Sequence, residues 1–179
     1  MLINILKKTE IIKNAILSTK VLEIDDSLTG KDSKGSTSSY YLGWVGALEQ
    51  SSQSVTTFYI PKNIEIVNSD TGDITIKLVD FKDGDGIAGF TKSIVDDTKN
   101  QILKSEIIIY DIDNLSDEKL ATVIRHEFGH ALGLAHSTAP EDLMAKTITT
   151  EFPYISECDV DAIVSLYDEG KLSVVVCEK

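Results

Sequence analysis

One stretch of the chain, His-Glu-Phe-Gly-His-Ala-Leu-Gly-Leu-Ala-His, constrains the fold more than any other. In a helix, side chains four residues apart lie on one face, so His126 and His130 can approach one metal ion. Gly133 can take the positive φ that ends a helix and turns the chain, which would return His136 as a third ligand. Glu127 lies one position round the helix, where its carboxylate can hold a metal-bound water without binding the metal itself.

The donor set indicates both the metal and the kind of site. Three imidazoles leave the fourth position of a tetrahedral zinc ion for water, which is typical of catalytic sites, whereas structural zinc sites usually have four protein ligands. All 3 histidines of the chain lie in this motif, and histidines merely packed on a core helix would not explain that distribution. The sequence therefore predicts one catalytic Zn²⁺ held by His126, His130 and His136, with Glu127 as the general base.

Length and charge limit the number of domains and the partners. With 179 residues, 42% of them hydrophobic, the chain is long enough for one domain with a substantial core. Its net charge of -12 disfavours nucleic acid and anionic membranes, and no apolar run approaches the ~20 residues that span a bilayer. We expect a monomeric catalytic domain over residues 1–179 without membrane insertion, in which residues 1–35 could form an N-terminal extension or a short pro-segment.

Two features bear on the cellular compartment. The charges of Lys7 and Lys8 follow the N-terminal apolar stretch, whereas a secretory signal has its charges first. The chain is therefore either intracellular or a fragment without its export signal. The 2 cysteines, Cys158 and Cys177, lack the C-x-x-C spacing of a zinc site. A returning C-terminal tail could join them in a disulfide, which would favour an oxidising compartment, and two free thiols are an equal alternative.

Hydrophobic periodicity predicts an α+β fold. Helices are predicted at residues 40–50, from Ser116 into the histidine motif, and from Ser156 to 167, while residues 7–20 fit a helix or a strand-like arm. Strands are predicted at residues 56–60, 64–67, 73–79, 87–91 and 102–110, the last of which should be central in the sheet. Residues 25–39 are rich in Ser, Thr, Gly and Asp and are predicted to form an exposed loop.

One acidic loop, Asp-Phe-Lys-Asp-Gly-Asp-Gly, resembles part of a calcium-binding loop. Aligning Gly86 with the invariant EF-hand glycine puts Phe81 at the first ligand position and Lys92 at the twelfth, and neither side chain binds calcium. An EF-hand is therefore excluded. A tight turn is favoured, and an irregular Ca²⁺ site on Asp83 and Asp85 is the alternative.

The histidine motif, followed downstream by Met144, resembles the metzincin clan of metallopeptidases. Within that clan, the letters H-E-F-G-H-A-L-G-L-A-H-S are most similar to the matrixins, the matrix metalloproteinase type. Residues 155–167 are similar to the matrixin closing helix, and residues 73–76 to its second sheet strand. The resemblance implies a zincin fold of the metzincin type, with a twisted mixed β-sheet, a zinc-binding active-site helix, a backing helix and a C-terminal helix.

The resemblance also implies roles for single residues. Met144 would be the Met-turn residue beneath the metal, and Asp159 would support that turn by a hydrogen bond. Ile87, Ala88 and Gly89 would form the edge strand to which an extended peptide or protein substrate adds as a further antiparallel strand. A secreted or cell-surface location is also favoured by the resemblance.

Four departures from the matrixin pattern change what it implies. Ala145, Lys146 and Thr147 follow the methionine where matrixins usually have Tyr-Pro, so the main specificity pocket should differ. Cys158 replaces an aspartate that pairs with the mature N-terminal ammonium in matrixins, so that contact should be missing. The cysteine of a cysteine-switch prodomain and the histidines of the family's structural zinc site are not found in this chain.

We therefore expect a zinc-dependent metalloendopeptidase that hydrolyses internal bonds of an extended polypeptide through Glu127-assisted attack of zinc-bound water. One alternative is a self-processing or partner-restricted protease with little general activity. The other is a non-catalytic zinc-dependent binding protein, which the intact Glu127 disfavours because a pure binder does not need that carboxylate.

Overall fold

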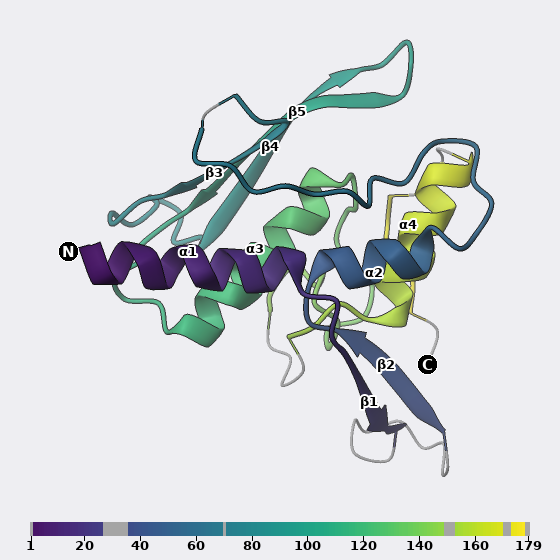
Figure 1. The fold of residues 1–179 in the computed structure, drawn as a ribbon, viewed down its shortest axis with the longest axis horizontal. Helices are drawn as coiled ribbons and strands as arrows, with labels where there is room; N and C mark the ends of the chain where they lie inside the picture. The colour runs from purple at the N-terminus through teal and green to yellow at the C-terminus, as the bar shows by residue number, and fades with distance from the viewer. Residues whose placement is uncertain (1, 27–35, 70, 149–152, 170–172, 178–179) are drawn as a thin grey trace.

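The computed structural model describes residues 2–26, 36–69, 71–148, 153–169 and 173–177, and its architecture is α+β, as the sequence predicted (Figure 1). The helices are α1 Leu2–Leu17, α2 Trp44–Ser51, α3 Asp117–Ala131 and α4 Glu157–Glu169. The strands are β1 Val21–Asp25, β2 Thr37–Tyr41, β3 Ile74–Leu78, β4 Gly89–Asp96 and β5 Gln101–Ile109. Among the described helices, none is both long enough and apolar enough to cross a bilayer.

The main sheet is mixed and has the strand order β3-β5-β4. β3 runs parallel to β5, and β4 runs antiparallel to it. β5 is the central strand, as predicted, and its alternating residues Ser105, Ile107 and Ile109 are buried. In the described part of the chain, the outer edge of β4 pairs with no further strand.

α3 lies against β4 and β5, and α1 packs along it (Figure 1). The helix starts where the sequence predicts, because Ser116 is the N-cap and its Oγ accepts a hydrogen bond from the Lys119 N–H at 3.2 Å. One face of the helix and its C-cap are buried in the core, through Leu120, Val123, Ile124, Phe128, Ala131 and Leu132. This packing fixes the rotation of α3 and therefore the direction in which its histidines point.

α4 packs on α2 and begins with a capping box at Ser156, the predicted start of this helix. The Ser156 N–H donates to Asp159 Oδ2 at 2.9 Å, and the Asp159 N–H donates to Ser156 Oγ at 3.3 Å. Aspartate therefore takes the place that glutamate usually has in this motif.

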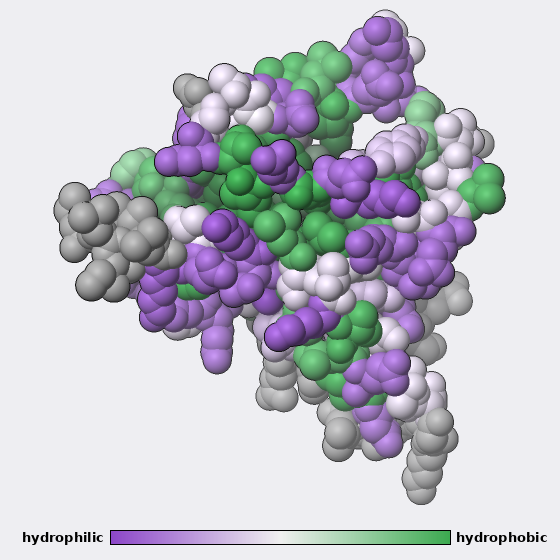
Figure 2. Space-filling view, in the orientation of Figure 1, coloured by the Kyte–Doolittle hydropathy of each residue, from purple (hydrophilic) through white to green (hydrophobic). Residues whose placement is uncertain are grey.

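Two strand predictions are wrong, because residues 56–60 and 64–67 are not in strands of the described structure. Pro61 interrupts this stretch, and the Phe58 N–H donates to Tyr167 O at the end of α4 instead of to a neighbouring strand. Residues 64–67 and β3 both line a groove of about 1660 Å³, and β5 is the only described strand that pairs with β3. Apolar surface gathers over this part of the molecule in Figure 2.

The predicted boundaries at the N-terminal end also change. Of the two alternatives for residues 7–20, the helix is found, and α1 starts earlier, at Leu2. Residues 25–39 were predicted as a loop, but β2 begins at Thr37 and pairs with β1. The rest of the predicted loop, residues 27–35, lies outside the described residues.

Tyr40 and Tyr41 belong to β2 although their spacing fits the helix that follows. The Tyr41 N–H donates to Ile155 O at 2.8 Å, and this pairing with a distant part of the chain holds the residue in extended conformation. The helix α2 therefore begins only at Trp44.

The acidic loop forms the favoured tight turn. The Asp85 N–H donates to Asp83 Oδ2 at 2.8 Å, the Gly86 N–H donates to Asp83 O at 3.1 Å, and Gly86 has φ 75°. The backbone of the turn thus uses the Asp83 side chain. A Ca²⁺ ion on Asp83 and Asp85 stays a prediction.

Candidate active site

The three histidines converge at the end of α3, as their spacing predicts. The Nε2 atoms of His126 and His130 lie 3.1 Å apart on one face of the helix. Gly133 has φ 103° and follows the helix C-cap, so the chain turns back there. This turn brings the ring centre of His136 to 4.8 Å from that of His130. One nitrogen of each ring lies within 4.8 Å of the other two.

Backbone carbonyls set the tautomers of the two helical rings. His126 Nδ1 lies 2.8 Å from Leu143 O, and His130 Nδ1 lies 2.7 Å from Leu134 O. A carbonyl oxygen can only accept, so each Nδ1 carries the hydrogen and a neutral ring keeps its lone pair on Nε2. In both rings Nε2 is therefore the nitrogen that is free to bind a metal.

These lone pairs fit zinc. Two lone pairs 3.1 Å apart repel each other unless a cation lies between them. Ligand nitrogens 2.0–2.1 Å from a tetrahedral zinc ion are about 3.3 Å apart, close to the observed separation. The chemistry of the donor set therefore matches a zinc ion bound by His126, His130 and His136.

Burial keeps part of this ligand set in its neutral form. Desolvation lowers the pKa of His126 to about 4. Desolvation also lowers the pKa of His136, and the neighbouring His130 and Lys146 act in the same direction. Neutral imidazole is the form that binds metals, so at neutral pH His126 is already in its ligand form.

Glu127 is buried beside the histidines and is held by a residue that the sequence analysis missed. The Thr91 hydroxyl donates to Glu127 Oε2 at 2.6 Å, and Glu127 O lies 3.0 Å from the same Oγ1. Burial raises the pKa of Glu127, and the Thr91 hydrogen bond opposes that rise. The sequence signal for Thr91 is its position two residues after Gly89, on the same face of β4.

Gly89 explains how β4 comes so close to the glutamate. A Cβ atom at Gly89 would lie 2.7 Å from both Cγ and Oε1 of Glu127. The predicted edge segment Ile87, Ala88 and Gly89 only partly coincides with the strand, because β4 begins at Gly89. Ile87 and Ala88 precede β4 and are exposed, and the Ala88 carbonyl accepts a hydrogen bond from the Tyr110 N–H at 2.9 Å.

Met144 lies beneath the histidine helix. Its side chain is fully buried, and a Cβ atom at Gly129 would lie 2.6 Å from Met144 Sδ. The preceding residue, Leu143, supplies the carbonyl that holds the His126 ring. The turn at Met144 and the His126 ring are therefore packed together.

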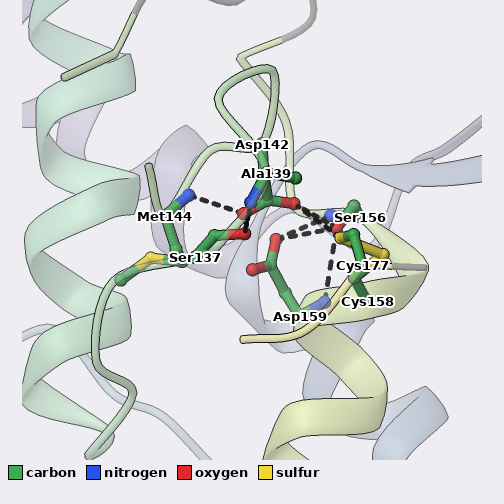
Figure 3. Close-up of a disulfide and its surroundings, with 8 residues drawn as sticks. All are labelled: Ser137, Ala139, Asp142, Met144, Ser156, Cys158, Asp159 and Cys177. Atoms are coloured by element: carbon green, nitrogen blue, oxygen red, sulfur yellow. Dashed lines mark hydrogen bonds between the residues drawn. A yellow bond between two sulfur atoms is a disulfide. The ribbon is translucent and has the colours of Figure 1, made fainter. Parts of the chain in front are cut away.

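The expected link from Asp159 to this turn is indirect (Figure 3). The Met144 N–H donates to Asp142 Oδ1 at 2.8 Å, so Asp142 is the residue that holds the turn. The Ser156 hydroxyl contacts both carboxyl groups, with its Oγ 2.8 Å from Asp142 Oδ2 and 3.2 Å from Asp159 Oδ2. The sequence analysis missed Asp142 because nothing in its local pattern indicates this contact.

The two carboxyl groups are buried together. Burial raises the pKa of Asp142. The pKa of Asp159 is raised well above its usual value, first by burial and then by the charge of Asp142. A proton on one of the two carboxyl groups therefore stabilises the buried pair.

Cys158 and Cys177 form a disulfide, with their Cα atoms 5.4 Å apart (Figure 3). This settles the alternative that the sequence left open. The bridge joins the first turn of α4 to the C-terminal tail, and Cys177 Sγ lies 3.6 Å from Asp142 Oδ2.

Comparisons with known proteins agree with this geometry. Residues 47–168 match the family model described as Matrixin. Matrix metalloproteinase-20 of Homo sapiens is 50% identical over 56 residues, which are 30% of this chain and 12% of the relative. Probable matrix metalloproteinase 095L of Invertebrate iridescent virus 3 is 43% identical over 68 residues, 37% of this chain and 18% of the relative. Matrix metalloproteinase-9 of Canis lupus familiaris is 53% identical over 49 residues, 27% of this chain and 7% of the relative. The matched segments thus span less than a fifth of these relatives.

Proposed function

Because the chain belongs to the matrixin family, we propose that it is a zinc endopeptidase that cuts internal bonds of an extended polypeptide. The resemblance predicted from the sequence and the expected enzyme class, a zinc metalloprotease, are confirmed at the level of the family. The observation that carries the proposal for this chain is the convergence of three imidazoles beside the buried carboxylate of Glu127.

His126, His130 and His136 would hold the zinc ion. When bound, zinc supplies Lewis-acid chemistry, since it acidifies water and polarises a peptide carbonyl. The carbonyls of Leu143 and Leu134 keep the two helical rings oriented for this task. Proteins usually fix a metal-binding histidine in this way, with the second ring nitrogen donating its hydrogen to a carbonyl or carboxylate oxygen.

Glu127 would be the general base and then the general acid. Its carboxylate would take a proton from the attacking water and give that proton to the leaving amine. Burial raises the pKa of Glu127, which makes the carboxylate a stronger base than one in water. Thr91 would keep Oε2 in place during both transfers.

The substrate would add to β4 as a further strand. The outer edge of β4 offers unpaired backbone groups in the described structure, and Gly89 places this strand directly against Glu127. A peptide bound there would pass the catalytic carboxylate. Ile87, Ala88 and Gly89 would then contact the substrate backbone.

We further propose that the chain acts as one monomeric catalytic domain in an oxidising, extracellular setting. The Cys158–Cys177 disulfide supports the compartment, since disulfides persist mainly outside reducing cytosol. The family resemblance supports secretion.

The test is cleavage of an unfolded protein such as casein by the parent chain and by Glu127→Gln, each with and without a chelator. We expect casein fragments only with the zinc-loaded parent, while Glu127→Gln keeps one zinc per chain by elemental analysis. Cleavage by Glu127→Gln within tenfold of the parent would refute its role as base. Exclusive self-cleavage would favour the processing protease, and zinc binding without any cleavage would favour the binding protein.

A further inference from the structure

The C-terminal tail forms a strand-like contact beside the third histidine. The Ala135 N–H donates to Ser173 O at 2.6 Å, and the Thr138 N–H donates to Val175 O at 3.1 Å. These two bonds flank His136 on its own backbone. Val175 is fully buried, so this side chain anchors the tail in the core, while Val174 and Val176 are exposed.

The other side of the same segment is held by the methionine turn. The Ser137 N–H donates to Met144 O at 2.8 Å, and Ser137 pairs in parallel with both Ala145 and Val175. The short segment that carries His136 is therefore the middle one of three, with the tail on one side and the turn on the other.

The His136 ring depends on this backbone more than the other two rings do. His126 and His130 lie on a packed helix, and each donates its Nδ1 hydrogen to a carbonyl. The structure gives no such bond for the exposed His136 ring within the residues that it describes. The His136 segment is therefore held by the two backbone segments on either side of it.

A covalent link also holds the tail. Within described residues 173–177, the Ser173 and Val175 carbonyls accept hydrogen bonds from the His136 segment, and Cys177 ties the end of the tail to Cys158 in the first turn of α4. The bridge also lies against Asp142, which holds the Met144 N–H (Figure 3). The disulfide is thus bonded to one neighbour of the His136 segment and contacts, through Asp142, the turn that forms the other.

We propose that the tail at residues 173–177, tied by the Cys158–Cys177 disulfide, is a positioning element for His136, so that the affinity for zinc depends on the disulfide. This inference rests on the proposed function, in which His136 is a zinc ligand. Groups that orient a metal ligand typically change metal affinity by about 10- to 100-fold. We expect a change in zinc affinity of about tenfold, the lower end of this range. The reason is that the rings of His126 and His130 keep their hydrogen bonds to backbone carbonyls.

The experiment is a double-mutant cycle on zinc affinity, measured by competition with a chromophoric chelator. The parent, Cys158→Ala/Cys177→Ala, His136→Ala and the combined variant are compared, with circular dichroism as the check on folding. Alanine avoids new thiols that could bind zinc. Removing the disulfide should weaken zinc binding about tenfold in the parent and leave it unchanged in the His136→Ala background.

Each result has a distinct meaning. Equal affinity with and without the disulfide overturns the inference and leaves the proposed function intact. An equal loss in both backgrounds also overturns it, because the effect would then be general and not transmitted through His136. A parent that binds no stoichiometric zinc sinks the proposed function itself. Should the disulfide-free chain fail to fold, Val175→Ala replaces it in the cycle. Val175→Ala should then weaken zinc binding by less than about tenfold in the parent and leave it unchanged in the His136→Ala background.

Discussion

Replacing Thr91 with valine keeps the size and branching of the side chain and removes only its hydroxyl. That hydroxyl donates to Glu127 Oε2 at 2.6 Å. Burial raises the pKa of Glu127, and the hydrogen bond from Thr91 opposes that rise. Without the hydroxyl, the pKa of Glu127 rises further and its carboxylate takes up a proton at a higher pH. The acid limb of the cleavage profile should therefore move to higher pH.

The structure also sets the size of the effect. A hydrogen bond to a charged acceptor contributes about 1.5–3 kcal/mol. The lower end applies to Thr91, because the residue is half-buried and its single hydrogen also faces the Glu127 carbonyl 3.0 Å away. About 1.4 kcal/mol corresponds to a factor of about ten in rate. We expect kcat/KM to fall about tenfold on the acid limb and much less at higher pH, where the carboxylate is ionised in both proteins.

The assay is kcat/KM for a fluorogenic peptide, measured across the pH range with saturating zinc. Thr91→Ser is the matched control, since it keeps the hydroxyl and loses only a methyl group, and its acid limb should coincide with that of the parent. Zinc content is measured in every sample, because a loss of metal would imitate a loss of base. Superimposed profiles for Thr91→Val and Thr91→Ser would refute the reasoning.

The remaining predictions concern stability. Gly129→Ala should cost about 1–3 kcal/mol in urea unfolding, because the new Cβ would lie 2.6 Å from Met144 Sδ; an unchanged midpoint would contradict the packing. The pKa of Asp159 is raised in the folded chain, so stability should fall as pH rises from 3.8 through the folded pKa. Asp159→Asn should flatten that slope when unfolding is compared at acid and neutral pH, and an unaltered slope would locate the titrating group elsewhere. Removing zinc with a chelator should lower the Tm, and zinc should restore it, whereas magnesium should not.

The parts of the site that lie close together in the chain could be predicted from the sequence. The helical repeat places His126 and His130 on one face whatever surrounds them, and Gly133 supplies the turn that returns His136. Capping is equally local, which is why Ser116 was recognised as a helix start.

Contacts between distant segments could not be predicted in this way. Thr91 meets Glu127 only because β4 lies at a particular height against α3, and that height depends on the whole sheet. Asp142 looks like any loop aspartate until the turn and α4 come together around it. Residues 64–67 were predicted as a strand because they are rich in β-branched side chains. A strand also needs a neighbour to pair with, and this segment has none among the described strands.

The carbonyl of Leu143 has a calorimetric consequence. It keeps one hydrogen on Nδ1 of His126, and Nε2 stays unprotonated at neutral pH. Metal uptake usually expels hydrogen ions from its ligands into the buffer. At this ring there is none to expel, so its share of the heat of zinc uptake is the same in phosphate as in Tris.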